Sequence, residues 1–441
     1  METSALIVLL MLLGMMAAYV PVFMALFFTS IFSFLIFSPE TPVLLLTQTL
    51  FRSMDNFALV VVLFFILCGN IMTAGTIVDK LVKVTNMLVS WLPGGLGMAG
   101  CLACGLFGAI SGSTVATVVA LGGFMIPALL SKGYPEKYTI GLMTAAPNLG
   151  IIIPPSISMI LYCMITNVSL QGLFLTGFVP GILIMLFTCI YTYVLLRNNT
   201  TIDRAPIPDF KEVIATLKDG FWSMMLPVII FVGTFSGVFT ANEAAVVACI
   251  YAFIVEIFIH KSMKLNTVKK VTVSSAVTSA TLLIIVAGAT CFGRYLTFEN
   301  VPGKIAEAVV GNIHSPVMFL MVMNILLLIV GMFMDVISAT LIIGPVILPM
   351  LGTFGIDVMH FGLLMTVNLA IGYCTPPVGV SMYITGAMAN KDIVFVTKAV
   401  MPFIIIQIIV LFMMTYMPDV VLWLPKLMGF WEAAGTSGPA L

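Results

Sequence analysis

Two proline pairs interrupt apolar segments of the chain, and they are the residues best placed to create a binding site. Pro154 and Pro155 lie in one segment, and Pro376 and Pro377 lie in another. Proline lacks an amide donor and clashes with the preceding turn, so carbonyls just before each pair lose their helical partners. Inside a bilayer such backbone persists only where it is buried in protein or lines a polar cavity. Freed carbonyls suit a cation such as sodium, whereas a kink without any ligand is the alternative.

The residues from 93 to 130 form the first of two predicted re-entrant hairpins that would face these helix breaks. Gly112 stands between Ser111 and Ser113 and is the expected tip, and Thr114 adds a further hydroxyl group. Small residues at this spacing can also serve close helix packing without any ligand. The hairpin is therefore a candidate source of hydroxyl oxygens.

The second predicted hairpin, residues 316–350, carries Asp335 inside a long apolar run. An acid at mid-bilayer costs about 2.5 to 3.5 kcal/mol on the insertion scale, so it is a functional hypothesis by default. A helix cap or an interhelical contact is the alternative role. Arg294 follows an apolar helix and could meet an anionic substrate, or it could reach the lipid headgroups instead.

The composition requires that these residues sit in a membrane protein. Of 441 residues, 61% are hydrophobic and only 8% are charged, whereas a soluble chain has about 25% charged residues. The net charge is zero, which gives no attraction to nucleic acid. We predict an all-α polytopic membrane protein, and soluble, disordered and nucleic-acid-binding classes are excluded.

The placement of Lys and Arg predicts the topology, because basic residues stay on the cytoplasmic side. If both hairpins return to their own side, only Arg52, Arg294, Lys304 and Lys426 of the 18 basic residues fall outside. The start of the chain has no positive region before its apolar run, so we expect a retained helix rather than a cleaved signal peptide. The predicted spans and hairpins are residues 5–37, 57–78, 93–130, 138–165, 172–196, 221–240, 241–259, 272–292, 316–350, 361–386 and 399–424.

An internal repeat relates the two halves of the chain. An offset of 222 residues brings Gly122 onto Gly344 and the first proline pair onto the second. We predict a first repeat (1–196) with broken helix 138–165, a cytoplasmic linker (197–220), and a second repeat (221–441) with broken helix 361–386. Because the hairpins open from opposite faces, the repeat is inverted, which is a recurring plan of secondary transporters.

Motifs for other energy sources and other chemistries are missing from the sequence. There is no G-x-x-x-x-G-K-[ST] loop for ATP, and no G-x-S-x-G or H-E-x-x-H motif of a hydrolase. We expect a protein that is not an enzyme, without a cofactor, driven by an ion gradient. His260, His314 and His360 lie near span ends, which argues against a proton relay, although proton coupling through Asp335 or Glu243 stays open. An intramembrane enzyme is a remote alternative.

The combined motifs resemble a known family over residues from about Phe51 to Phe403. The stretches that carry the likeness are ISGSTVATVVALGGFMIPALLSKGY, NLGIIIPPS, GVFTANEAA, MDVISAT and YCTPPVG. They resemble the large membrane subunit of tripartite ATP-independent periplasmic (TRAP) transporters. A stand-alone sodium- or proton-coupled anion symporter of related architecture is the alternative.

The resemblance implies an elevator mechanism in the bacterial inner membrane. The hairpins and broken helices would form a mobile transport domain, and the other helices a scaffold. The partners implied are a small four-helix membrane subunit and a periplasmic binding protein that delivers an organic anion. The implied sodium ligands are Ser111, Gly112, Ser113, Asn148, Gly150, Ile153, Pro154, Gly331, Asp335, Gly372, Thr375 and Pro376. The residues expected at the substrate are Ser113, Thr114, Pro155, Ser156, Ser338, Pro377 and Arg294.

Overall fold

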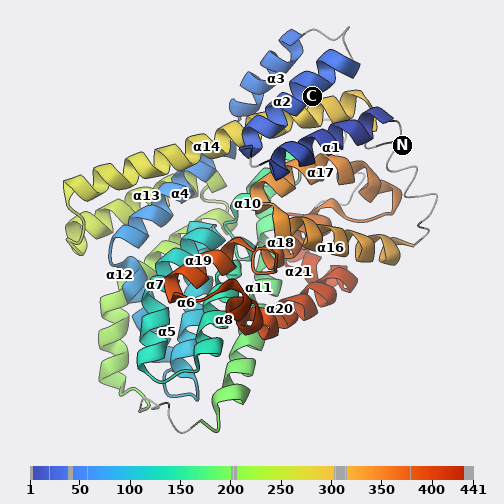
Figure 1. The fold of residues 1–441 in the computed structure, drawn as a ribbon. Coiled ribbons are helices and arrows are strands. Elements are labelled where there is room, and N and C mark those ends of the chain that lie inside the picture. Colours follow the sequence, from blue (N-terminus) through green and yellow to red (C-terminus); the bar gives the residue numbers. More distant parts are fainter. Residues whose placement is uncertain are drawn as a thin grey trace.

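The chain is a bundle of helices (Figure 1). The computed structural model describes residues 3–18, 20–37, 43–56, 58–199, 202, 206–301, 303, 313, 315–377 and 379–431, and these residues contain no strand. Within these ranges nine helices are long and apolar enough to cross a membrane, or ten if α3 and α4 count as one bent span. The predicted all-α polytopic class is confirmed. Lys304 and His314 lie outside the described residues.

The N-terminal region corrects the predicted span 5–37. It is two helices, α1 and α2, that pack against each other. Pro21 explains the interruption, because proline disfavours helical geometry at the preceding residue and has no amide donor. The elements of this region are α1 (Thr3–Ala17), α2 (Val22–Phe37), α3 (Val43–Met54), α4 (Ala58–Ala74) and α5 (Ile77–Val89).

The first predicted hairpin and the first predicted broken helix follow in sequence. Two helices meet at Gly112, and the next span is divided into four short helical pieces. Whether the hairpin returns to its own side of the bilayer stays a prediction. The elements are α6 (Gly95–Ser111), α7 (Thr114–Ser131), α8 (Glu136–Ala145), η1 (Ala146–Asn148), α9 (Leu149–Ile152) and α10 (Ile157–Thr166).

The middle of the chain holds the longest helices. Among the described residues 206–220 of the expected linker, helix begins at Phe210, where the Asp209 side chain accepts a hydrogen bond from the Phe210 amide at 2.8 Å. The helical part of the second half therefore starts earlier than the predicted residue 221. The elements are α11 (Leu170–Leu196), α12 (Phe210–Phe235), α13 (Ala241–Ile254), η2 (Val255–Ile259) and α14 (Leu265–Phe298).

The second predicted hairpin and broken helix repeat the earlier arrangement. Two helices flank Met334 and Asp335, and the following span is interrupted at the second proline pair. The elements are α16 (Pro316–Phe333), α17 (Val336–Thr353), α18 (Val358–Gly372), α19 (Val380–Ala389), α20 (Ile393–Tyr416) and α21 (Pro418–Leu427).

Helices of the two halves pack reciprocally. Helix α10, which follows the first proline pair, packs on α17, and α19, which follows the second pair, packs on α7. The contacts occur at equivalent glycines: a Cβ atom at Gly344 would lie 3.2 Å from Ile165, and one at Gly122 would lie 3.4 Å from Met388. Gly122 and Gly344 are the pair that the offset of 222 superimposes, so the sequence repeat corresponds to a repeat of packing.

Candidate functional site

The first helix break lies between Ile152 and Ile157. Ile153 is extended, and the Ser156 side chain caps α10 by accepting a hydrogen bond from the Met159 amide at 3.5 Å. Pro154 and Pro155 have no amide hydrogens to donate, so the carbonyls of the preceding turn lose their helical partners. All residues of the break are buried. The predicted interruption is therefore present, and it is enclosed by protein.

The tip of the first hairpin (Ser111, Gly112 and Ser113) packs directly on the first break. A Cβ atom at Gly108 would lie 2.4 Å from the Gly150 Cα atom, and one at Gly112 would lie 2.8 Å from the Pro155 carbonyl oxygen. Gly112 has a φ of 60°, a conformation that glycine adopts without the steric cost of a side chain. Residues with a side chain would not allow the tip and the break to come this close. The close contact brings the hydroxyl groups of the tip next to the freed carbonyls of the break.

Hydroxyl groups at the first tip form a local network. The Thr117 hydroxyl donates to the Ser113 carbonyl at 2.7 Å and lies 3.3 Å from the Ser111 hydroxyl. The Ser113 hydroxyl caps α7 by accepting from the Ala116 amide at 3.4 Å. Three hydroxyl oxygens thus gather beside the break.

The second helix break lies between Gly372 and Val380. The Thr375 hydroxyl donates to the Ile371 carbonyl at 2.7 Å, and the Gly379 amide donates to the Met332 carbonyl, next to the second tip, at 3.4 Å. Thr375 and Pro376 are half-buried, and Pro377 is exposed. This break therefore resembles the first in outline but is more open.

The tip of the second hairpin (Met334 and Asp335) meets the second break in the same way. A Cβ atom at Gly372 would lie 2.4 Å from the Gly331 carbonyl carbon. Asp335 is half-buried and caps α17, because its carboxylate accepts a hydrogen bond from the Ser338 amide at 2.9 Å. A cap bond occupies one carboxylate oxygen, so the second oxygen is still available to a ligand.

Several buried oxygens near the two breaks have no hydrogen-bond partner in the described part of the chain. Buried polar atoms are normally paired, so each exception needs an explanation such as a ligand or water. Two of them are amide oxygens at equivalent places, and the others are hydroxyls beside the tips and breaks. They are Asn148 Oδ1, Asn368 Oδ1, Thr114 Oγ1, Ser338 Oγ and Ser381 Oγ.

The amide nitrogens of the two asparagines are held by other helices. Asn148 donates to Gln407 on α20 at 3.0 Å, and Gln407 in turn donates to the Ala145 carbonyl at 2.9 Å. Asn368 donates to Asn324 on α16 at 2.8 Å. These bonds fix each amide so that its oxygen is the atom left without a partner.

Arg294 lies away from both tips. It lines a separate cavity together with Arg52, and no tip residue lines that cavity. The nearest hairpin residues in its wall are Leu341 and Pro345 on α17. Leu341, the nearer of the two, is six residues past Asp335, which corresponds to about 9 Å along a helix. The structure therefore separates Arg294 from the residues of the two tips, and contact of Arg294 with an anionic substrate stays a prediction.

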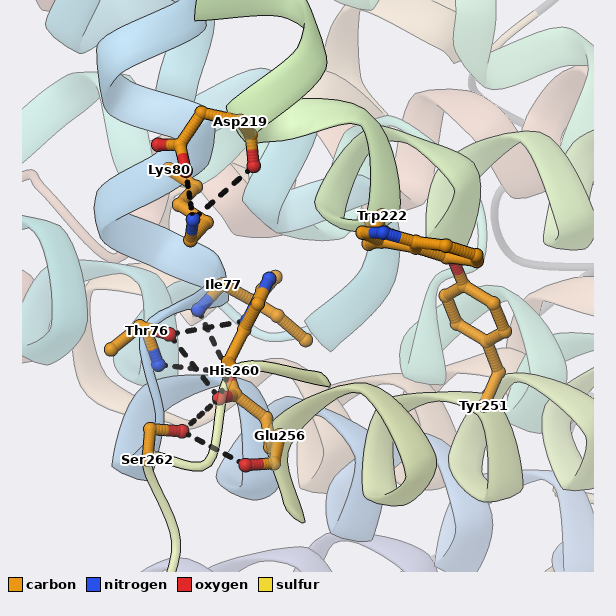
Figure 2. A network of polar contacts seen from close by, with 9 residues as sticks. All are labelled: Thr76, Ile77, Lys80, Asp219, Trp222, Tyr251, Glu256, His260 and Ser262. Carbon is orange, nitrogen blue, oxygen red and sulfur yellow. Dashed lines mark hydrogen bonds and ion pairs between the residues drawn. The ribbon is translucent and has the colours of Figure 1, made fainter. Parts of the chain in front are cut away.

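The sequence interpretation missed a polar network around Glu256 (Figure 2). Glu256 lies in η2, and its partners include residues at the start of α5. This carboxylate is fully buried and accepts hydrogen bonds from the amides of Thr76 and Ile77, both at 2.8 Å. The Ser262 hydroxyl also donates to it. The sequence did contain a signal, because Glu256 lies inside the predicted span 241–259. A charged side chain in a membrane span costs free energy unless its charge is compensated.

The same network joins α5 to the end of α13. Glu256 lies in η2, and a Cβ atom at Gly75 would lie only 2.1 Å from its carboxylate carbon. Burial lowers the pKa of the His260 imidazole, while the neighbouring Glu256 carboxylate opposes that shift. Nearby, Lys80 pairs with Asp219 and thereby connects α5 to α12 (Figure 2). Because α5 packs on α6, the network supports the first hairpin.

Paired breaks against paired hairpin tips define a class of protein, the membrane transporter with an internal repeat. Comparison with known proteins identifies the family. The family model of the tripartite ATP-independent periplasmic transporter, DctM component, matches residues 9–420. The chain belongs to this family of TRAP transporter large permease subunits, and it is a multi-pass protein of the inner membrane.

Individual relatives agree with this assignment. The chain is 38% identical to the C4-dicarboxylate TRAP transporter large permease protein DctM of Pseudomonas aeruginosa, over 90% of this chain and 92% of that protein. It is 35% identical to the isethionate TRAP transporter permease protein DctMQ of Oleidesulfovibrio alaskensis, over 86% of this chain and 60% of that one. It is 32% identical to the sialic acid TRAP transporter permease protein SiaT of Haemophilus influenzae, over 87% of this chain and 62% of that protein.

A solved structure supports the fold. The YdaH transporter of Alcanivorax borkumensis, described as having an unusual topology, matches with a TM-score of 0.62 at 15% identity. The match covers 86% of this chain and 89% of that one.

Proposed function

We propose that this permease subunit takes up a small organic anion, a carboxylate or sulfonate, together with sodium ions. In this mechanism the two hairpins and the two broken helices move as one transport domain against the remaining helices. The observation that carries the proposal is the pair of helix breaks, each packed against a hairpin tip and each accompanied by buried oxygens that have no hydrogen-bond partner.

The proposal includes two sodium sites. The first lies between the Ser111–Ser113 tip and the break from Asn148 to Pro154, and the second lies between Gly331 or Asp335 and the break from Gly372 to Pro376. Carbonyl, amide and hydroxyl oxygens can replace the hydration shell of sodium without losing a proton. This chemistry favours sodium over protons as the coupling ion.

The organic anion is expected between the two tips. Hydroxyl groups of Thr114, Ser156 and Ser338 can donate hydrogen bonds to it, and the N-terminal ends of α10 and α19 add partial positive charge. The relatives are named for C4-dicarboxylates, isethionate and sialic acid, which all carry a carboxylate or a sulfonate. That shared chemistry supports an organic anion here.

The partners in this proposal are a small four-helix membrane subunit and a periplasmic protein that binds the solute and delivers it. Family membership supports both. A stand-alone symporter would transport without them.

Uptake into proteoliposomes tests the proposal. The permease is reconstituted with its small subunit, and radiolabelled solute is added with or without the binding protein. A sodium gradient alone should drive accumulation, and a proton gradient of equal size should not. Equal uptake with protons alone would reject sodium coupling, and full uptake without the binding protein would favour the stand-alone symporter.

A further inference from the structure

A second cavity with the chemistry of an anion site lies apart from the hairpin tips. It has a volume of about 520 Å³, is open to the surface and is bordered by α3, α10, α14 and α17. Small-molecule pockets fall in the same size range, about 300 to 1,000 Å³. Arg52 and Arg294 line it, and no acidic side chain does. Its other polar lining residues are Gln48, Thr49, Ser53, Asn56, Thr290 and Thr297.

The two arginines have no acidic partner among the described residues, and what sets them apart is that they line one cavity together. Lys80, Lys391 and Lys426 each form an ion pair with an Asp or Glu. Arg52 and Arg294 form no ion pair or hydrogen bond with any residue that the structure describes. A guanidinium group presents five donors in a planar fork that matches a carboxylate or a sulfonate. The cavity therefore has two positive charges and no internal counter-charge.

The cavity borders the helices that lead to the tips. Its wall includes Leu341 and Pro345 on α17, the second arm of the second hairpin, and Met164 and Ile165 on α10, which follows the first break. The remaining wall residues come mainly from α3 and α14. The topology predicted from the basic residues puts both arginines on the outer side of the membrane. With that topology, a solute from the outer side would meet this cavity before Asp335.

We propose that this cavity is an entry site that captures the organic anion before it moves to the hairpin tips. The movement of the anion from this cavity to the tips rests on the proposed function. The binding of an anion in the cavity does not depend on the proposed function. With two positive charges and no negative one, the site favours a dianion, such as a C4-dicarboxylate, over a monoanion of similar size. Both arginines are exposed, so binding is weak and falls as ionic strength rises.

The experiment measures the electrostatic potential in the cavity and its occupancy. A Thr297→Cys variant places a thiol in the wall, one turn after Arg294. Of the native cysteines only Cys189 is not buried, so Cys189→Ser removes the reactive background. The complex with its small subunit is labelled with sulfonatoethyl methanethiosulfonate, an anion, and with trimethylammonioethyl methanethiosulfonate, a cation. Rates are measured with and without succinate, and with propionate as the monoanion.

The proposal predicts that the ratio of anionic to cationic labelling falls about tenfold in an Arg52→Gln/Arg294→Gln variant. Succinate should slow labelling more than propionate does, and the double variant should lose this protection. Arg52→Lys/Arg294→Lys should keep most of the ratio. Lys426→Gln is the matched control, because it removes one positive charge on the same predicted side without lining the cavity.

Two results would overturn the entry site. One is an unchanged ratio and unchanged protection in the double glutamine variant. The other is that succinate does not protect in pure phosphatidylcholine vesicles while added phosphatidylglycerol does, which would show that the arginines bind lipid headgroups. If succinate protection is normal but solute uptake is independent of sodium, the proposed coupling fails and the entry site stands.

Discussion

The two helix breaks have the same plan but opposite surroundings. Every residue from Ile153 to Ser156 is buried, and Pro154 and Pro155 line a small internal cavity together with side chains of α4, α11, α12 and α13. In the second break Thr375 and Pro376 are half-buried, and Pro377 is exposed. The second tip also has the acid Asp335, whereas the first tip has no charged residue. In the proposed mechanism the first break is a rigid, buried part of an ion site. The second break is accessible to solvent and lies beside the negative charge of Asp335.

Cysteine labelling gives the largest expected contrast between the breaks. In a Cys189→Ser background, Thr375→Cys should react with a charged maleimide about a hundredfold faster than Ser156→Cys, because a buried thiol reacts only after local opening. Rates are measured without sodium or solute. Equal rates would show that the two breaks are equally accessible, and the comparison would then fail.

Close backbone contact is the feature that the breaks share, so both should respond alike to added bulk. Gly108→Ala and Gly372→Ala each force a Cβ atom to within 2.4 Å of backbone, and overpacking of this kind costs about 1 to 3 kcal/mol. We expect lower thermal unfolding temperatures in detergent for both variants. Gly352→Ala is the control, because nothing lies within 4 Å of its added Cβ atom. If only one of the two variants had a lower unfolding temperature, the two breaks would not share this packing.

Charge at the second tip should matter for transport beyond its role as a helix cap. Asp335→Asn keeps a capping side chain, since Asn caps as well as Asp, but it removes the carboxylate charge. Transport should fall about tenfold and require more sodium, at unchanged thermal stability. Asp209→Asn, which alters a cap outside the tips, should leave transport unaltered. If Asp335→Asn transported normally and with normal sodium dependence, Asp335 would serve only as a helix cap.

The smallest expected effect concerns the support of the first hairpin by Glu256. Glu256→Gln keeps the size of the side chain but weakens the bonds to Thr76 and Ile77, which should cost about 1 kcal/mol in the free energy of unfolding. The measurement is urea unfolding of the detergent-solubilised protein. Glu243→Gln is the control, because Gln can also complete its capping box. Equal stability of Glu256→Gln and wild type would show that the buried charge adds nothing.

The sequence predicts features that depend on local backbone chemistry. Gly112 as a tip and the interruption at Pro154 follow from residue type alone, and both are present. The capping bond of Asp335 was one of two roles left open by the sequence. Pro21 carried a similar signal, but the apolar run on both sides of it concealed the division of residues 5–37 into two helices.

Contacts between distant segments could not be predicted in this way. The bond between Asn148 and Gln407 joins residues 259 positions apart, and no spacing rule relates them. Arg294 meets Arg52 across a cavity because α3 and α14 pack together. Glu256 is compensated by the start of α5, which lies about 180 positions away. These arrangements depend on tertiary packing and not on the period of a helix.

The reciprocal packing of α10 on α17 and of α19 on α7 has a consequence for biosynthesis. Thr166 ends α10 and Val336 begins α17, so at about 5 to 20 residues per second the ribosome needs roughly 10 to 30 s to supply the missing neighbour. During that interval the faces of α10 and α7 that later contact the second half have no partner from it. A truncated first half would leave these faces without their packing partners, so we expect it to be degraded rather than to accumulate.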